Sequence, residues 1–317
     1  MPEFRTEIDL KPSAFRINHK SKILFNGSCF TENIGKNLED LSFNVRINPF
    51  GVVYNPLSLL NSLGILIDGE EFKSEELEYH NELWFSWDHH SSFSNPDREE
   101  CLKRINQEIK KSSKHLHKSD FLLITFGTAW VYRLKKTGVI VSNCHKLPEK
   151  EFDRILISPE DIISSWKVFI PEILRKNKNL KIIFTVSPVR HWKDGAHGNQ
   201  VSKAVLLLAI EEICKLFPEN TEYFPAYEIL LDDLRDYRFY SDDLMHPNSL
   251  AIKYIWELFE KVYFDKETCE INKELEKLIR ARNHRVYNEG TEAHRKFVEK
   301  ITKQTKSLSK KYPFLEL

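Results

Sequence analysis

The chain has 317 residues, and 41% of them are hydrophobic, which is enough to bury a substantial core. Lys and Arg together number 47, as do Asp and Glu, so the net charge is zero and gives no general attraction to nucleic acid or to an anionic membrane.

The cysteines and the N-terminus indicate a compartment. Five scattered cysteines form no Cys-x-x-Cys pair, which favours a reduced protein without structural zinc. Acidic residues stand near the N-terminus where a secretory signal would be basic and then apolar, and no apolar run has the length of a membrane span. We therefore expect a cytoplasmic protein without a membrane span.

A strand, a tight turn and a helix are predicted over residues 22–41. Residues 23–25 form an apolar run, Gly27 permits a sharp turn, and Thr31 can cap a helix with one apolar face. Ser28 and Cys29 lie in that turn. A hydroxyl or thiol there gains backbone N–H donors and the positive end of the helix dipole, both of which stabilise an oxyanion. The alternative is that Ser28 only caps the helix and Cys29 is buried.

Strands and helices are then expected to alternate along the chain. The patterns predict strands over 43–47, 121–126, 181–186 and, more weakly, 223–226, and helices from Pro56, over 96–117, from Ser158, over 197–217 and over 248–262. Residues 68–95, which are rich in aromatic side chains, and the stretch with Cys144 and His145 are expected to be irregular. This alternation predicts an α/β protein with a parallel sheet of about five strands, covered on both faces.

The composition changes near residue 265. Residues 270–311 are highly charged and have high helix propensity. We expect two units, an α/β catalytic domain over 1–264 and a charged helical extension over 265–317 that packs on the core or on a partner.

Candidate catalytic residues lie after strands, because the chemistry of an open parallel sheet gathers beyond the carboxyl ends of its strands. Ser28, Gly51 and Thr128 hold such positions. A base is offered by Asp243 and His246, since a carboxylate at this spacing in a turn can bind Nδ1 and leave Nε2 to accept a proton. Asp242 competes for the same role, and the alternative is a plain helix start with an exposed histidine.

The ordered set of motifs resembles the GSCFA family, a branch of the SGNH (GDSL-type) esterase and lipase superfamily. The matching segments are Gly27-Ser-Cys-Phe30, Asn48-Pro-Phe-Gly-Val-Val-Tyr-Asn-Pro56, Thr125-Phe-Gly-Thr-Ala-Trp-Val-Tyr132, Ser187-Pro-Val-Arg-His191 with Asn199-Gln200, and Asp243-x-x-His246. The resemblance implies a flavodoxin-like three-layer α/β/α sandwich.

The resemblance also implies Ser28 as nucleophile, His246 as general base and Asp243 as its partner, with the N–H groups of Ser28 and Gly51 as oxyanion donors. The wider superfamily has Gly-x-Asn-Asp after the third strand, whereas this chain has Gly127-Thr-Ala-Trp130. The Thr128 hydroxyl, a backbone N–H or Asn55 would then replace the missing asparagine.

The expected activity is hydrolysis of a carboxylic ester, such as an O-acyl group on a carbohydrate, without cofactor or metal. An alcohol in place of water would make the protein an acyltransferase. Expected substrate contacts are Trp87, His89, Trp130 and His191.

Three alternatives remain open at this point. Cys29 could be the nucleophile, although we rank it below Ser28 because the next residue along faces a different way. A metal could bind among the histidines, although their spacing matches no familiar ligand set; these are His89, His90, His191, His197 and His246. The chain could also be a weakly catalytic carbohydrate- or partner-binding protein with the C-terminal helices as its docking surface.

Overall fold

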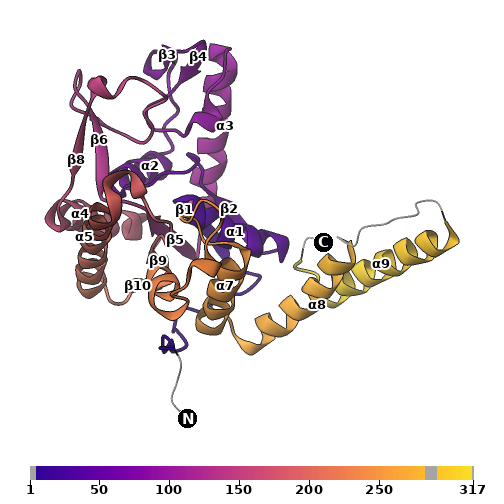
Figure 1. Ribbon diagram of the computed structural model, residues 1–317. Helices are drawn as coiled ribbons and strands as arrows, with labels where there is room; N and C mark the ends of the chain where they lie inside the picture. Colours follow the sequence, from indigo (N-terminus) through magenta and orange to yellow (C-terminus); the bar gives the residue numbers. More distant parts are fainter. Residues whose placement is uncertain (1–4, 283–290, 316–317) are drawn as a thin grey trace.

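The computed structural model describes residues 5–282 and 291–315. Within them, five parallel strands form a central sheet in the order β2, β1, β5, β9, β10 (Figure 1). The strands are β1 Lys22–Gly27, β2 Asn44–Ile47, β5 Phe121–Phe126, β9 Lys181–Val186 and β10 Thr221–Tyr223. Numbered by their order in the chain, they follow the 2-1-3-4-5 arrangement of flavodoxin-like folds, which confirms the predicted class.

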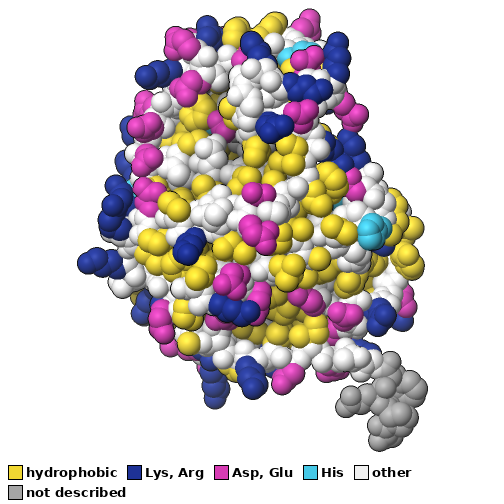
Figure 2. All heavy atoms as spheres, turned by 90° about the vertical axis from the view of Figure 1, so that its left-hand side faces the viewer, with side chains coloured by type: hydrophobic (Ala, Val, Ile, Leu, Met, Phe, Trp, Pro, Cys, Tyr) yellow, Lys and Arg dark blue, Asp and Glu magenta, His cyan; other side chains and the backbone are white. Residues whose placement is uncertain are grey.

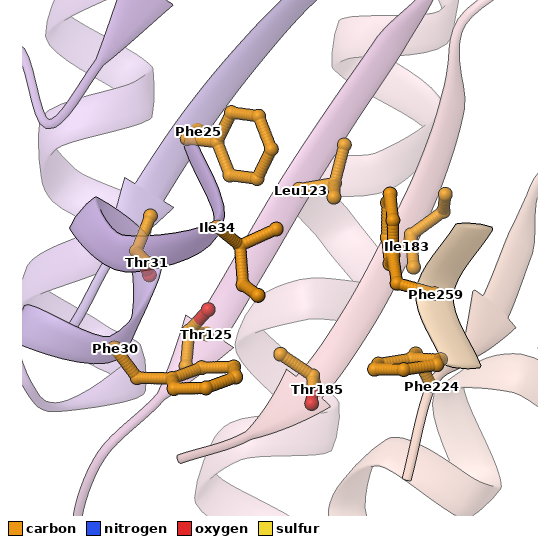
Figure 3. A pocket seen from close by; sticks show the side chains of 10 residues that line it. All are labelled: Phe25, Phe30, Thr31, Ile34, Leu123, Thr125, Ile183, Thr185, Phe224 and Phe259. Atoms are coloured by element: carbon orange, nitrogen blue, oxygen red, sulfur yellow. The ribbon is translucent and has the colours of Figure 1, made fainter. Parts of the chain in front are cut away.

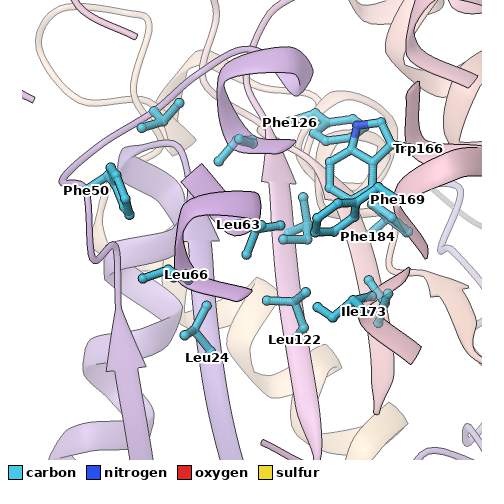
Figure 4. Packing of buried hydrophobic residues seen from close by; sticks show 14 of the residues in the cluster. Leu24, Phe50, Leu63, Leu66, Leu122, Phe126, Trp166, Phe169, Ile173 and Phe184 are labelled. Atoms are coloured by element: carbon cyan, nitrogen blue, oxygen red, sulfur yellow. The ribbon is translucent and has the colours of Figure 1, made fainter. Parts of the chain in front are cut away.

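Both faces of this sheet are apolar, as expected for a parallel sheet covered on each side. Alternate side chains point to opposite faces. Leu24, Leu122 and Phe184 join one buried cluster, and Ile23, Phe25 and Leu123 join the other. Figure 4 shows the first cluster, in which side chains of β1, β5 and β9 pack against the helices above them.

Helices cover each face and complete the three-layer sandwich. Four helices contribute to the first cluster: α2 Pro56–Asp68, α3 Arg98–Leu116, α4 Pro159–Lys176 and α5 Gly195–Leu216. The second cluster lies under α1 Cys29–Asp40 and α7 Ser249–Tyr263. Between β10 and α7 the chain forms a short α6, Ala226–Glu228, and a π-helical turn, Ile229–Asp233.

Two of the predicted helix starts are confirmed by the hydrogen bonds of their N-cap residues. Asn55 accepts a hydrogen bond from the Ser58 N–H at 2.8 Å before Pro56, and Ser158 accepts one from the Asp161 N–H at 3.1 Å. The predicted cap at Thr31 is wrong. The α1 helix begins three residues earlier than this cap implies, at Cys29, and Ser28 occupies the N-cap position.

Two regions predicted to be irregular contain strands. The strands β6 Trp130–Leu134, β7 Ile140–Val141 and β8 Phe152–Leu156 form an antiparallel sheet whose buried side chains pack around Trp87. In the aromatic segment, β3 Glu78–His80 and β4 Leu83–Phe85 form a hairpin (Figure 1). Asn81 and Glu82 in its turn have φ values of +47° and +61°, as a type I′ turn requires of its two central residues.

The C-terminal segment is helical, with α8 Lys266–Arg282 and α9 Glu292–Lys311, and residues 283–290 lie outside the described ones. Figure 1 shows the two helices side by side, extending away from the sandwich. Ile271 and Leu275 of α8 are buried in the cluster shared with α1 and α7. Lys311 and Glu274 pair between the helices at 2.6 Å. The extension therefore packs on the core, while the domain boundary at 264/265 stays a prediction.

A small cavity lies between the sheet and its α1 and α7 layer. Figure 3 shows apolar side chains and the hydroxyls of Thr31, Thr125 and Thr185 around it. Its volume of about 20 Å³ accommodates no more than a water molecule, so we do not regard it as a substrate site.

The surface over β8, α4 and α5 carries charges of both signs. Figure 2 shows Lys and Arg interspersed with Asp and Glu there, with apolar patches between them. In the described part of the chain, each helix is too short or too polar to cross a membrane.

His89 is predicted to make the fold sensitive to acid. It is fully buried, stacks on Phe50 with ring centroids 4.3 Å apart, and burial lowers its pKa from 6.5 to about 3. Below pH 6.5 the unfolded chain therefore binds a proton at this site that the folded chain does not. We expect this difference to remove roughly 2 kcal/mol of stability between about pH 7 and about pH 5.

Urea unfolding of the wild type and of His89→Phe at these two pH values measures this effect. The variant should lose less stability on acidification, because phenylalanine cannot be protonated. Equal losses in the two proteins would contradict the assignment of a neutral His89 in the folded state.

Candidate active site

The turn after β1 is packed tightly against β5. A Cβ atom on Gly27 would lie 2.6 Å from the carbonyl oxygen of Thr125 and 2.7 Å from Oγ1 of Thr31, so only glycine fits. The Gly27 N–H donates to Oδ1 of Asn48 at 2.9 Å. These contacts fix where the chain leaves the sheet and where α1 begins.

Ser28 and Cys29 occupy this turn in different environments. The Ser28 side chain is 0% exposed, and its Oγ has no hydrogen-bond partner among the described residues. A pocket, described below, opens at this end of the sheet. Cys29, the first residue of α1, lines this pocket, and Ser28 does not. The expected role of Ser28 as nucleophile does not fit this geometry, because a substrate in the pocket cannot reach a fully buried hydroxyl.

The pocket has a volume of about 470 Å³ and lies beyond the carboxyl ends of β1, β5 and β9, where a flavodoxin-like sheet places its ligands. Its walls come from the turn after β1, the segment before α2, the small antiparallel sheet, the loop after β9 and the segment before α7. The lining residues are Cys29, Tyr54, Asn55, Thr128, Trp130, Tyr132, Val141, Ser142, Asn143, Cys144, Arg154, Val189, Arg190, His191, Trp192, Lys193, Met245 and His246.

The predicted histidine–carboxylate pair is formed at the mouth of this pocket. Nδ1 of His246 lies 2.6 Å from Oδ2 of Asp243, and the other carboxylate oxygen accepts the backbone N–H groups of Met245 and His246. These bonds hold the pKa of Asp243 down, at about 2, so the carboxylate is ionised at neutral pH. An ionised Asp243 favours the Nδ1–H tautomer and leaves Nε2 of His246 as a proton acceptor.

Opposing effects act on the Cys29 thiol. Burial raises its pKa and the charge of Glu32 adds to this, while the N–H groups of Cys29 and Phe30 and the charge of Lys203 lower it. The net direction is upward, so the resting group is a thiol that needs a base in order to react.

Lys203 of α5 is a fully buried lysine beneath the site. Its Nζ donates to the carbonyl oxygens of Gly127 and Ser187, each at 2.7 Å, and so connects the chain segments that follow β5 and β9. Burial lowers its pKa to about 7. Because Lys203 also interacts electrostatically with Cys29 and His191, its charge contributes to the potential inside the pocket.

The predicted oxyanion donors separate into two groups. The Gly51 N–H already donates to the Asn48 carbonyl at 2.8 Å, and the Ser28 N–H faces the Thr125 carbonyl at 3.4 Å. Neither residue lines the pocket, so the structure does not bring these two predicted donors to it. Thr128 and Asn55 do line it.

Both remaining donors retain a hydrogen that their hydrogen bonds within the protein do not require. One Nδ2 hydrogen of Asn55 is used by Oγ of Ser58, at 2.9 Å, and a second remains. Thr128 Oγ1 accepts the Trp130 N–H and lies 3.0 Å from Oγ of Ser202. When Ser202 donates, the Thr128 hydrogen can turn to a ligand.

Two of the four predicted substrate contacts lie at the pocket. Trp130 and His191 line it, and burial together with the charge of Lys203 lowers the pKa of His191 to about 3, so this imidazole is neutral. Trp87 instead packs edge-on against Phe85 and Phe152. His89 lies in the core and does not line the pocket, so the structure does not bring it to this site.

The proposed metal alternative gains no support from the geometry. Among residues 5–282 and 291–315, no group of three or more His, Cys, Asp or Glu side chains is arranged to hold a metal ion. The histidines considered for such a site do not converge, since His89 is in the core and His246 is at the pocket mouth.

Comparison with known proteins decides the family. A model of the GSCFA family matches residues 22–259, and a model of the GSCFA domain protein C-terminal domain matches residues 275–317. The chain belongs to the GSCFA family. No curated protein matches the sequence. A solved structure from Streptococcus pneumonia, provisionally described as a platelet activating factor, has a TM-score of 0.39 and 12% identity, covering 76% of this chain and 82% of the other.

The GSCFA tetrad, residues 27–30, is thus the turn that brings Cys29 to the pocket. Other residues of this GSCFA protein were not anticipated from sequence, among them Arg154, Arg190 and Lys203. A signal for Lys203 existed, because it shares a helix face with the buried residues Leu206 and Ile210 at i+3 and i+7. The two arginines lie in segments whose partners are distant in sequence, which no local pattern reveals.

Proposed function

We propose that this GSCFA protein is a carboxylic-ester hydrolase of SGNH type in which Cys29, rather than Ser28, is the nucleophile. The observation that carries the proposal is that Cys29, at the N-terminus of α1, and His246, bonded to Asp243, line one pocket beyond the carboxyl ends of the sheet. A nucleophile, a base and a group that orients the base are the components of acyl transfer.

In the first half-reaction, Cys29 Sγ attacks the carbonyl carbon of the ester and its proton passes to Nε2 of His246. The carbonyl π electrons move to oxygen and form a tetrahedral oxyanion. This intermediate collapses, the alkoxide leaves with the proton from His246, and a thioester of Cys29 remains. Because burial keeps the resting sulfur protonated, the reaction requires this transfer to His246.

In the second half-reaction, His246 takes a proton from water, and the resulting hydroxide attacks the thioester carbonyl. The C–S bond breaks, the acid is released and the sulfur regains a proton. The Cys29 N–H at the start of α1, the Thr128 hydroxyl and the Asn55 amide are the donors we assign to the oxyanion. Such donors each contribute about 3 kcal/mol in well-formed oxyanion holes.

The mechanism requires a reduced thiol. All five cysteines are free in the structure, and a reducing compartment such as the cytoplasm, as predicted from the sequence, would keep Cys29 active.

Trapping the acyl-enzyme tests the proposal. The wild-type protein, mixed with p-nitrophenyl acetate and quenched in acid, should carry one acetyl group, and peptide mapping by mass spectrometry should place it on Cys29. The matched control is His246→Ala, which lacks the base and should accumulate the acetyl group far more slowly.

The residue that carries the acetyl group distinguishes the two candidate nucleophiles. An acetyl group on Ser28 would contradict the assignment of Cys29, and no label with no release of p-nitrophenol would contradict the hydrolase itself. A Cys29 label that persists in water and is discharged by added alcohol would indicate an acyltransferase.

A further inference from the structure

The charged side chains that line the pocket have one sign. Arg154, Arg190 and Lys193 are among its lining residues, and no Asp or Glu of the described chain is. The net charge of the whole protein is zero, so this local excess does not follow from composition. Closely spaced positive charges in a concave, partly desolvated site attract anions more strongly than the same charges on an open surface.

Two of these cations have carboxylate partners that do not line the pocket. Arg154 binds Asp194 through both of its terminal nitrogens, and Lys193 lies 2.6 Å from Glu149. Neither carboxylate lines the pocket. The partners offset part of the charge of these cations, but the cations line the pocket and the carboxylates do not.

Arg190 is different, because among the described residues it has no carboxylate within ion-pair distance. Its guanidinium donates to the carbonyl of Leu244 and lies over the rings of Trp192 and Tyr240, 4.9 and 4.5 Å from their centroids. Its Nε is buried without a partner. A cation fixed on aromatic faces, with no counter-charge, is suited to bind an anionic group of a ligand.

Aromatic rings complete this wall. Trp130, which has the guanidinium of Arg154 stacked 4.4 Å from its ring centroid, lines the pocket together with Tyr132 and Trp192. The wall thus combines cations with aromatic rings, a combination suited to an anionic ligand.

We infer that the substrate of the proposed hydrolase is an ester carrying a negatively charged group, a carboxylate or a phosphate, which Arg190 and Lys193 hold while the ester lies at Cys29. That the anionic ligand is a substrate rests on the proposed function, whereas the binding of an anion in the pocket does not depend on catalysis.

A matched pair of esters tests the inference. Mono-p-nitrophenyl glutarate ends its acyl chain in a carboxylate, and p-nitrophenyl valerate ends a chain of the same length in a methyl group. At low ionic strength we expect wild-type kcat/KM to favour the glutarate at least about tenfold, and high salt should reduce this preference. Arg190→Gln and Lys193→Gln should each reduce it, and the double variant should abolish it.

Controls separate charge recognition from damage to the site. Arg190 also holds the Leu244 carbonyl beside His246, so its loss can slow both esters, but such damage cancels in the ratio of the two kcat/KM values. Arg190→Lys keeps the charge and should keep most of the preference. Lys167→Gln removes one charge from the exposed side of α4 and should leave the ratio unchanged.

The outcomes distinguish this inference from the proposed function. Equal kcat/KM values for the two esters in the wild type would overturn the anionic substrate and leave the hydrolase standing. Calorimetric titration of Cys29→Ala with monomethyl glutarate and with methyl valerate measures binding without turnover. The anion site would be supported if Cys29→Ala bound monomethyl glutarate but not methyl valerate, and if the added Arg190→Gln change abolished that binding. This conclusion would hold even if the wild type hydrolysed neither ester.

Discussion

Cys29→Ala is expected to lower the kcat of ester hydrolysis at least about a thousandfold, because removal of a nucleophile eliminates the covalent route and leaves only binding and electrostatic effects. Ser28→Ala is the matched control one residue away. Its hydroxyl is fully buried and has no partner, so its removal should change kcat by no more than a few fold. The measurement is p-nitrophenyl acetate turnover by the wild type and both variants.

A third variant tests the chemistry at the same position. Cys29→Ser keeps a nucleophilic atom at the N-terminus of α1, where His246 lines the same pocket, so we expect activity between those of the wild type and Cys29→Ala. Loss of turnover in Ser28→Ala with normal turnover in Cys29→Ala would refute our assignment and restore the expectation drawn from the sequence. Circular dichroism would show whether the variants are folded.

Lys203 should make the protein more stable as the pH rises above neutrality. The pKa of Lys203 is about 7 in the folded state, whereas its ordinary value is 10.5. Between about pH 7 and pH 10.5, the unfolded chain therefore holds a proton on Lys203 that the folded chain has lost. Binding of this proton stabilises the unfolded state, and that stabilisation weakens as the pH rises. From about pH 7 to about pH 9.5, the free energy of unfolding should gain roughly 3 kcal/mol from this group.

The comparison with Lys203→Met isolates this gain. Other groups titrate over the same range, but they do so in both proteins, so the difference between wild type and variant reports Lys203. Urea unfolding should show that difference moving in favour of the wild type as the pH rises. Lys167→Met, on an exposed helix face, should show no such change. A difference independent of pH would mean that Lys203 stays charged in the folded protein.

The fold could be predicted because its signals are local. The strands β1, β5 and β9 are continuous apolar runs, and α2 and α4 begin at a cap residue followed by proline. The small antiparallel sheet was missed because only part of each strand is buried, which weakens the alternation of apolar and polar residues. The hairpin of β3 and β4 was missed because Asn81 and Glu82 are not the Asn-Gly or Asp-Gly pair that signals such a turn.

The candidate site was predicted in part. Asp243 and His246 were found because a carboxylate three residues before a histidine can reach its ring within one turn. The choice between Ser28 and Cys29 depends on the residue at which α1 begins. Successive helical residues point about 100° apart, so a start three residues earlier than expected changes which side chain meets the pocket. That start depends on the fit of Gly27 against β5, which sequence does not show.

The ion pair between Arg154 and Asp194 has a consequence for the shape of the pocket. Arg154 belongs to the small antiparallel sheet, and Asp194 precedes α5 in the loop after β9, so one contact joins two segments that are distant in sequence and both contribute to the pocket wall. This part of the pocket wall is therefore held together by a pair of side chains and not by the central sheet. We therefore expect a change in either partner to alter the shape of the pocket while leaving the central sheet and its helices intact.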